Sequence, residues 1–309
     1  MPPRSNRVFW SGFALSAAAA ILFSTKAIWV KLAFVQTKID PVSLLALRML
    51  FALPFYLLVA VWQNKKSSPL STKDLLGILL MGCAGYYLSS LFDFIGLQYI
   101  SAGLERLILF LYPSLAVLIN TLLFKTKLYR HQIWALVLTY CGIGLAYWGE
   151  WQSVQEDAGF FWGSFMVFCC AITYSFYLVG SGHWIPKAGS LRYTAYAMLA
   201  ATLGIFVHYG ISQPTLPQVM ENKIWQYGIL LALLATVLPS FLMSMGMKRI
   251  GSNNTSIITS IGPVSTILQA HFFLGESITL SQIAGTVLVL MGVAVMGRSP
   301  AASGKSLVG

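Results

Sequence analysis

The sequence predicts an all-α membrane protein, a polytopic bundle of ten transmembrane helices made of two inverted five-helix repeats. Three observations support this fold: the composition, the alternation of apolar runs with charged loops, and a repeated sequence pattern. Hydrophobic residues make up 57% of the chain and charged residues only 9%, with a mean hydropathy of +0.73, whereas soluble domains carry roughly 25% charged residues. This number of charged residues is too small to cover the surface of a soluble protein. The composition therefore indicates that most of the surface faces lipid.

Ten apolar runs are long enough to cross a bilayer, whose hydrocarbon core takes about 20 residues of helix. Each run is expected to be helical, because an open strand cannot satisfy its backbone hydrogen bonds in lipid. The first run continues through Ile28, which favours a membrane span over a cleaved signal peptide. The predicted spans are residues 12–33, 41–62, 74–97, 102–124, 132–148, 159–181, 193–212, 225–247, 253–274 and 282–297.

The basic residues gather in alternate loops, a pattern typical of membrane topology rather than of a nucleic-acid-binding patch. Because basic residues mark the cytoplasmic side, both termini are predicted to be cytoplasmic, with tails at 1–11 and 298–309. The basic set is Arg4, Arg7, Lys65, Lys66, Lys73, Lys125, Lys127, Arg130, Lys187, Arg192, Lys248, Arg249, Arg298 and Lys305. The opposite loops hold Lys38, Lys223, Asp40, Glu150, Glu156, Asp157, Glu221 and Glu276.

The two halves of the chain repeat each other at a shift of 150 residues, so that Pro113 corresponds to Pro263 and Gly142 to Gly292. This predicts two five-helix repeats, at 12–148 and 159–297. Five is an odd number, so the second repeat enters the membrane from the other side, an arrangement that recurs among secondary transporters. The alternative is that membrane helices resemble one another by composition alone.

Three stretches resemble the drug/metabolite transporter superfamily, in its EamA family: PVSLLALRMLFALPFYLL, ISAGLERLILFLYPSLAVLINTLLF and IGSNNTSIITSIGPVSTILQAHFFLGESITLSQIAGTVLVLMGV. The resemblance implies a metabolite or drug carrier, often an exporter of amino acids or related compounds. It also implies a central cavity formed by spans one to four and six to nine. Gly275-Glu276 matches the family pattern, whereas the equivalent Lys125-Thr126 departs from it.

Ionisable side chains inside the predicted spans are candidates for substrate binding or coupling, because a charge in lipid is costly. Lys26 or Arg48 would meet a carboxylate of the substrate, and Asp93 and Glu105 would set their geometry or titrate. The alternative is that these charges form ion pairs that hold the helices together. Arg106, next to Glu105, points about 100° away from it on a helix, so the two cannot both face one cavity.

Three further residues are expected to shape the cavity. Pro113 and Pro263 each remove a backbone donor and are predicted to kink their helices, either for gating or for packing. Tyr112, beside Pro113, is the preferred aromatic candidate for the cavity wall.

The predicted function is secondary active transport, by alternating access, of a small carboxylate-bearing or amino-acid-like metabolite out of a bacterial cell across the inner membrane. The alternatives are efflux of cationic drugs, a non-transporting membrane protein or an intramembrane enzyme. The chain has no Walker loop, and no catalytic or metal-ligating motif lies within its spans. No enzyme activity, cofactor, metal or nucleic acid is expected. The expected partners are a small-molecule substrate, membrane lipids, a proton or counter-substrate, and a second copy of the chain.

Overall fold

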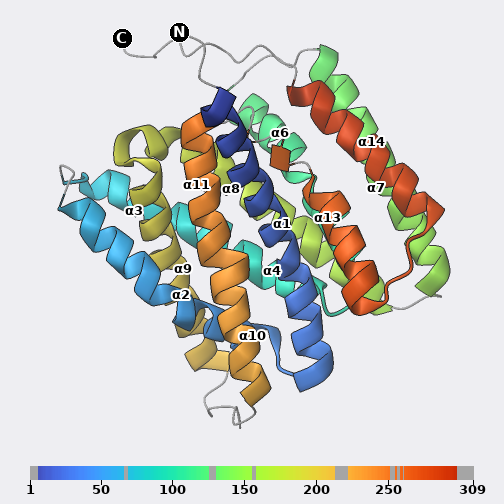
Figure 1. Cartoon of the computed structure of the whole chain (residues 1–309), viewed down its shortest axis with the longest axis horizontal. Coiled ribbons are helices and arrows are strands. Elements are labelled where there is room, and N and C mark those ends of the chain that lie inside the picture. Colours follow the sequence, from blue (N-terminus) through green and yellow to red (C-terminus); the bar gives the residue numbers. More distant parts are fainter. Residues whose placement is uncertain are drawn as a thin grey trace.

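A computed structural model of the chain describes residues 6–65, 69–124, 130–154, 158–212, 222–250, 255, 258–259 and 261–297. These residues are helical apart from short turns and loops (Figure 1). In chain order the helices are α1 (Asn6–Thr37), α2 (Pro41–Asn64), α3 (Thr72–Gly82), η1 (Cys83–Leu88), α4 (Ser89–Gly96), α5 (Ala102–Leu109), α6 (Tyr112–Phe124) and α7 (Arg130–Val154). The second half contains α8 (Ala158–Ala188), α9 (Ser190–Ser212), α10 (Asn222–Ala232), η2 (Leu233–Val237), α11 (Leu238–Ile250), α13 (Gly262–Gln269), η3 (Ala270–Leu274) and α14 (Leu280–Gly297).

These segments correspond to the ten predicted spans, because α3–η1–α4, α5–α6 and α10–η2–α11 each make up one span and α13–η3 forms the second part of the ninth. Most of the first part of that span, at 253–260, lies outside the described residues. Within the described residues, seven helices are long and apolar enough to cross a membrane by length and composition. The others are α7, α13–η3 and α14, whose apolar part is the shorter run Leu280–Val295. Several spans are longer than predicted, since α1 begins at Asn6 and α8 continues to Ala188. Of the predicted N-terminal tail at 1–11, residues 1–5 lie outside the described residues and residues 6–11 belong to α1. The predicted C-terminal tail at 298–309 also lies outside the described residues.

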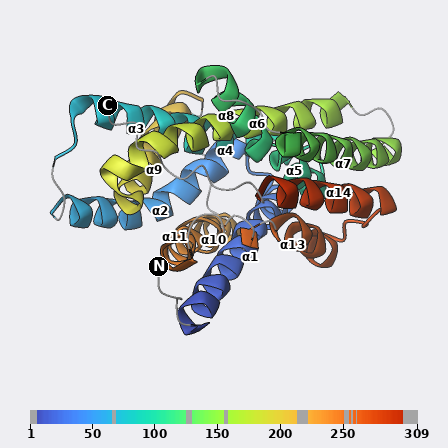
Figure 2. The same ribbon diagram turned by 90° about the horizontal axis from the view of Figure 1, so that it is seen from above.

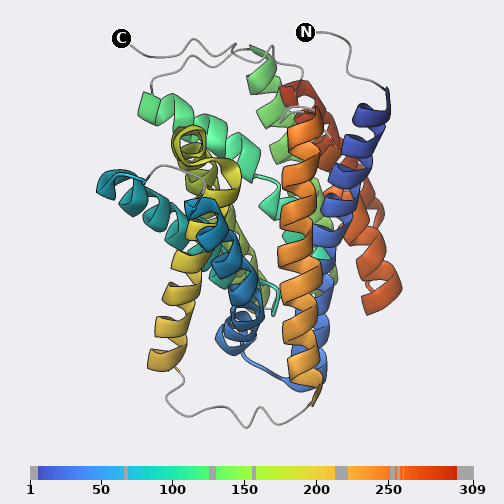
Figure 3. The same ribbon diagram turned by 60° about the vertical axis from the view of Figure 1, so that its left-hand side comes forward.

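The helices pack as an inverted repeat requires. α1 packs along α11 and α8 along α4, which pairs the first span of each half with the third span of the other. α2 packs against α9, and α7 against α14, so these two contacts join equivalent spans. The last pair lies together at one edge of the bundle in two perpendicular views (Figures 1 and 2). A view from a third side shows α1 running beside α11 (Figure 3).

Close contacts between glycines repeat with the same symmetry. A methyl group built on Gly96 would lie 2.9 Å from the carbonyl oxygen of Gly163, where α4 meets α8. In the equivalent contact between α11 and α1, a methyl group on Gly246 would lie 3.2 Å from the oxygen of Gly12. Small residues let helix backbones approach closely in lipid, where there is no hydrophobic force between helices. The two halves therefore use one interface twice, in opposite orientations.

Two irregularities also repeat at the shift of 150 residues. The third and eighth spans each contain a wide π-helical turn, η1 and η2, that starts at Cys83 and at Leu233. The fourth and ninth spans are interrupted before their prolines, where the amide of Leu111 donates to Ile108 and that of Ile261 to Ile258. Each of these spans is thus broken rather than smoothly kinked, and Pro113 and Pro263 lie in the first turns of α6 and α13. A first turn tolerates proline, because its amides have no partner within the helix.

Candidate functional site

The charged side chains of the first repeat meet where α1, α4 and α5 come together. The ammonium nitrogen of Lys26 lies 2.8 Å from Asp93 Oδ2 and 3.7 Å from Glu105 Oε1. Both carboxyl groups are almost fully buried, with side chains 1% and 0% exposed, whereas Lys26 is 18% exposed. One lysine therefore contacts two buried acids, as the ion-pair alternative drawn from the sequence expects.

Arg48, on α2, is buried beside this cluster and is only 4% exposed. Its Nη2 donates to Ser90 Oγ at 3.2 Å, and its Cζ lies 5.3 Å from the centroid of the Phe94 ring. Within the described parts of the chain, no carboxylate lies at ion-pairing distance from it, and its Nε has no hydrogen-bond partner. A hydroxyl and a ring face offset only part of the cost of burying a guanidinium, and the charge of Asp93 acts on it from beyond ion-pairing distance.

The helix separates Glu105 from Arg106, as the angle between them predicts. Glu105 turns toward α1, whereas a methyl group built on Gly262 of α13 would lie 3.0 Å from Arg106 Nη2. Arg106 is half-buried. It therefore lies against α13 rather than sharing the surroundings of Lys26.

Tyrosines extend from the charged residues along α8. Tyr112 packs edge-on against Tyr174 with ring centroids 5.2 Å apart, and its carbonyl accepts from Ser175 Oγ at 3.0 Å. The hydroxyls of Tyr86, in the wide turn η1, and Tyr177 are 2.9 Å apart. Tyr112 thus belongs to a row of aromatic side chains between α6, η1 and α8.

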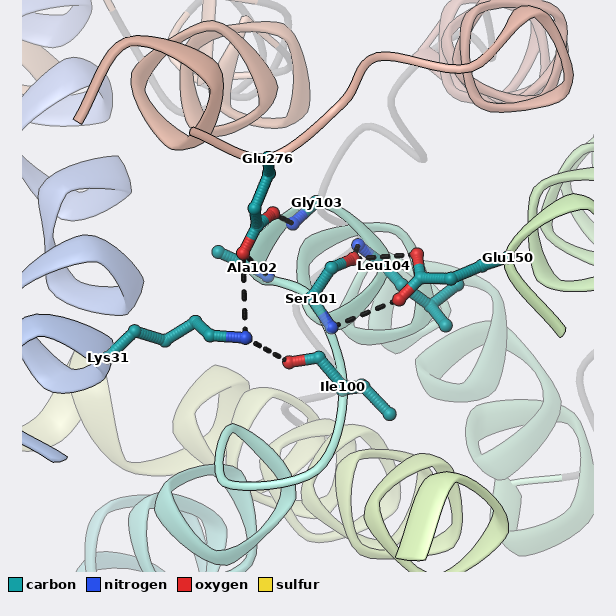
Figure 4. Close-up of polar contacts among 8 residues, drawn as sticks. All are labelled: Lys31, Ile100, Ser101, Ala102, Gly103, Leu104, Glu150 and Glu276. Atoms are coloured by element: carbon teal, nitrogen blue, oxygen red, sulfur yellow. Dashed lines mark hydrogen bonds and ion pairs between the residues drawn. The ribbon is translucent and has the colours of Figure 1, made fainter. Parts of the chain in front are cut away.

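A second polar cluster surrounds the start of α5 and comprises Lys31, Ser101, Glu150 and Glu276 (Figure 4). Sequence reasoning gave these residues no role in the site. A signal was present, because Ser101 occupies a typical N-cap position, where its hydroxyl accepts from the amide of Leu104 at 3.0 Å. The partners of that cap come from α7 and from the loop after η3, far along the chain, so the sequence could not identify them.

One cavity, of about 380 Å³, is lined by Asn64, Leu70, Arg192 and Tyr196, near the end of α2 and the start of α9. Its lining includes neither Lys26 nor Arg48. Among the residues that the structure describes, no group of three or more His, Cys, Asp or Glu side chains could hold a metal ion.

Comparisons with known proteins identify the family. The EamA-like transporter family matches residues 10–148 and 161–298, one domain in each half. An uncharacterized transporter of Bacillus subtilis, YcbK, is 31% identical over 270 residues, which cover 86% of each chain. An uncharacterized inner membrane transporter of Salmonella typhimurium, YicL, is 24% identical over 279 residues, covering 89% of this chain and 91% of that protein.

The fold matches a protein crystal structure with a TM-score of 0.63 and 18% sequence identity, over 95% of this chain and 96% of that one. Such low identity shows the fold alone. Family and fold together make the chain a multi-pass integral membrane protein of a transporter class rather than an enzyme. This protein belongs to the EamA-like transporter family.

Proposed function

We propose that the protein is a secondary active carrier that exports a small carboxylate-bearing metabolite across the cytoplasmic membrane by alternating access. The observation that carries the proposal is Arg48, a buried guanidinium without a carboxylate partner among the described residues. Arginine binds carboxylates through two parallel hydrogen bonds. A substrate carboxylate would supply the counter-charge that the site lacks.

The pairing of Lys26 supports the same assignment. Lys26 already contacts Asp93 and Glu105. An incoming anion would have to compete with these carboxylates at Lys26, whereas at Arg48 no described carboxylate lies at ion-pairing distance. In this scheme Lys26, Asp93 and Glu105 form the coupling group, which exchanges a proton or a contact when substrate binds. Tyr112, Pro113 and Pro263 would form the aromatic and gating parts of the path. The name of the Salmonella relative and the basic loops support an inner-membrane location with both termini cytoplasmic.

A counterflow assay in proteoliposomes tests the function, because exchange reveals a carrier whichever way it works in the cell. Vesicles loaded with one unlabelled compound are given the same compound labelled, across a panel of amino acids, other carboxylates and cationic dyes. We expect exchange of at least one carboxylate. Exchange of the dyes alone would contradict the carboxylate assignment and favour cationic drug efflux.

The variant Arg48→Gln separates a binding role from a structural one. Arg48 has one hydroxyl, one ring face and the charge of Asp93 beyond ion-pairing distance to offset its burial. Its removal should therefore change the unfolding temperature little, while lowering carboxylate exchange at least about tenfold. Arg48→Lys keeps the charge but loses the planar fork, so we expect partial exchange. Full exchange by a well-folded Arg48→Gln protein would exclude Arg48 from the site.

A further inference from the structure

The start of α5 is held by two carboxylates from distant parts of the chain (Figure 4). Glu150, near the end of α7, accepts from the amide of Ser101 at 3.0 Å and from its hydroxyl at 2.6 Å. Glu276, from the second repeat, accepts from the amides of Ala102 at 3.0 Å and Gly103 at 3.4 Å. The first amides of a helix have no partner within it and attract negative charge, so both contacts are favourable.

Lys31 completes a bridge between the two repeats. Its ammonium group donates to the carbonyl of Ile100 at 2.6 Å and lies 3.5 Å from Glu276 Oε1. The side chains of Lys31 and Glu276 are only 22% and 20% exposed, so water screens this pair less than a surface pair. We call Lys31, Glu276 and the amides of Ala102 and Gly103 the α5 latch.

The backbone around Glu276 fixes its direction. Gly275 has a φ of 70° and ends η3 in the left-handed conformation, which glycine adopts without steric cost. The amide of Glu276 then bonds to Ala270, and its carbonyl lies 2.9 Å from His271 Nδ1. The carboxylate is thus aimed at α5 by a turn whose own hydrogen bonds are satisfied.

All parts of the latch lie on one face of the bundle. The first span ends there, the fourth begins there, and the ninth ends there, so this face is opposite the one where α1 begins. Under the proposed topology it is the external face.

The other repeat lacks the residues for a matching latch. At the shift of 150 residues, Glu276 corresponds to Thr126. The first spans align at a shift of 151, as the contacts of Gly12 and Gly163 show, so Lys31 corresponds to Gly182. The charged contacts of the latch can therefore form on one face only.

We propose that the α5 latch is a one-sided gate, which favours the conformation closed to the outside over the one closed to the cytoplasm. Inverted repeats make the two conformations nearly equal in free energy. Opening the external face would separate Glu276 of the second repeat from α5 of the first, so the latch would be lost in that conformation and would favour the other. The inference rests on the alternating access of the proposed function.

The latch is also connected to the buried charges. Lys31 and Lys26 lie on α1, and the amides of Ala102 and Gly103 lie less than one turn before Glu105 on α5. A substrate anion bound at Arg48 that also attracts Lys26 would weaken the contact of Lys26 with Glu105 and loosen the first turn of α5, where the latch is anchored. Binding and opening are thereby coupled through one short helix.

Access to Cys170 provides a test that needs no substrate. Cys170 is 2% exposed, and its Sγ lies 3.4 Å from Ser89 Oγ, one turn before Asp93. In a protein with the other three cysteines replaced by serine, a membrane-impermeant maleimide is applied to right-side-out and to inside-out vesicles. In the Glu276→Ala variant we expect Cys170 to react from the outside about tenfold faster or more. The loss of charge-assisted hydrogen bonds should shift the equilibrium toward the conformation open to the outside. Lys31→Met should have a smaller effect, because Glu276 keeps its amides.

Asp74→Asn is the matched control. It breaks another ion pair between the repeats, from Lys187 Nζ to Asp74 Oδ1 at 3.0 Å, on the face where α1 begins. It should not raise external labelling. The gate is contradicted if neither Glu276→Ala nor Lys31→Met labels faster than its parent, if Asp74→Asn has the same effect, or if the gain appears only in inside-out vesicles. Carboxylate exchange is measured separately, so it can fail while the gate is upheld, or the reverse.

Discussion

Lys26 shares one ammonium group between two buried carboxyl groups, and this arrangement predicts how its loss will act. Lys26→Met leaves Asp93 and Glu105 without their cation in a site that is almost closed to solvent. We expect destabilisation by about 3–5 kcal/mol, because breaking a buried pair leaves an uncompensated charge. Thermal unfolding of the detergent-solubilised protein measures it.

A second substitution shows whether the pair accounts for that loss. Adding Asp93→Asn to Lys26→Met removes one of the stranded charges and should recover part of the lost stability. If Lys26→Met unfolds at the parental temperature, or if the double variant is no more stable than the single one, the ion pair contributes little to the fold.

Gly275 permits another test at the scale of one residue. Gly275→Ala strains a left-handed position by about 1–2 kcal/mol and should displace Glu276, which raises external labelling of Cys170. Gly189 has a similar φ of 78° with open space around it. Gly189→Ala should therefore lower stability as much as Gly275→Ala does, without raising the external labelling of Cys170. Equal labelling in the two variants would mean that strain, and not the latch, controls access.

Among the elements, α7 and α14 cross so closely that only glycine fits. A methyl group on Gly142 would lie 2.6 Å from the carbonyl oxygen of Gly285, whereas Gly144 has nothing within 4 Å. Gly142→Ala should therefore destabilise the protein by about 1–3 kcal/mol through overpacking, while Gly144→Ala should be neutral or slightly stabilising. The measurement is the unfolding temperature of each variant. Similar unfolding temperatures for Gly142→Ala and Gly144→Ala would contradict the close crossing of α7 and α14.

For the whole molecule, the prediction is the orientation of the chain. In a protein without its native cysteines, a cysteine at Lys38 should react with an impermeant reagent on intact cells. A cysteine at Lys65 should react only after permeabilisation, since the two positions lie at opposite ends of α2. External labelling at 65, or at 66 or 127, which lie outside the described residues, would contradict cytoplasmic termini.

The sequence was sufficient for the fold because its signals are repeated many times. Ten apolar runs and one shift of 150 residues support the same count, and the repeated contacts of Gly12 and Gly163 agree with it. The charged residues near the site could be named, since a charge in lipid is conspicuous. The pairing of these charges was not predictable. Lys26 lies at ion-pairing distance from both acids and Arg48 from neither, and this depends on how α1, α2, α4 and α5 pack.

The contacts of the α5 latch were also not predictable from the sequence. Glu276 was noted as part of a family pattern, but its partners are backbone amides, which every residue except proline carries. No side-chain pattern can indicate such a contact, because it depends on where the first turn of α5 lies. The interruption before Pro113 was likewise expected only as a kink.

The wide turns η1 and η2 bear on the history of the chain. A π-helical turn is rare and holds an extra residue within an otherwise α-helical run, and the two turns begin 150 residues apart, at Cys83 and Leu233. Two independent insertions at one depth in equivalent helices would be a coincidence, whereas one duplication copies the turn with everything around it. The shared position of η1 and η2 favours a turn that the five-helix unit already carried before it was doubled, whereas η3, a third π-helical turn, has no counterpart in α6.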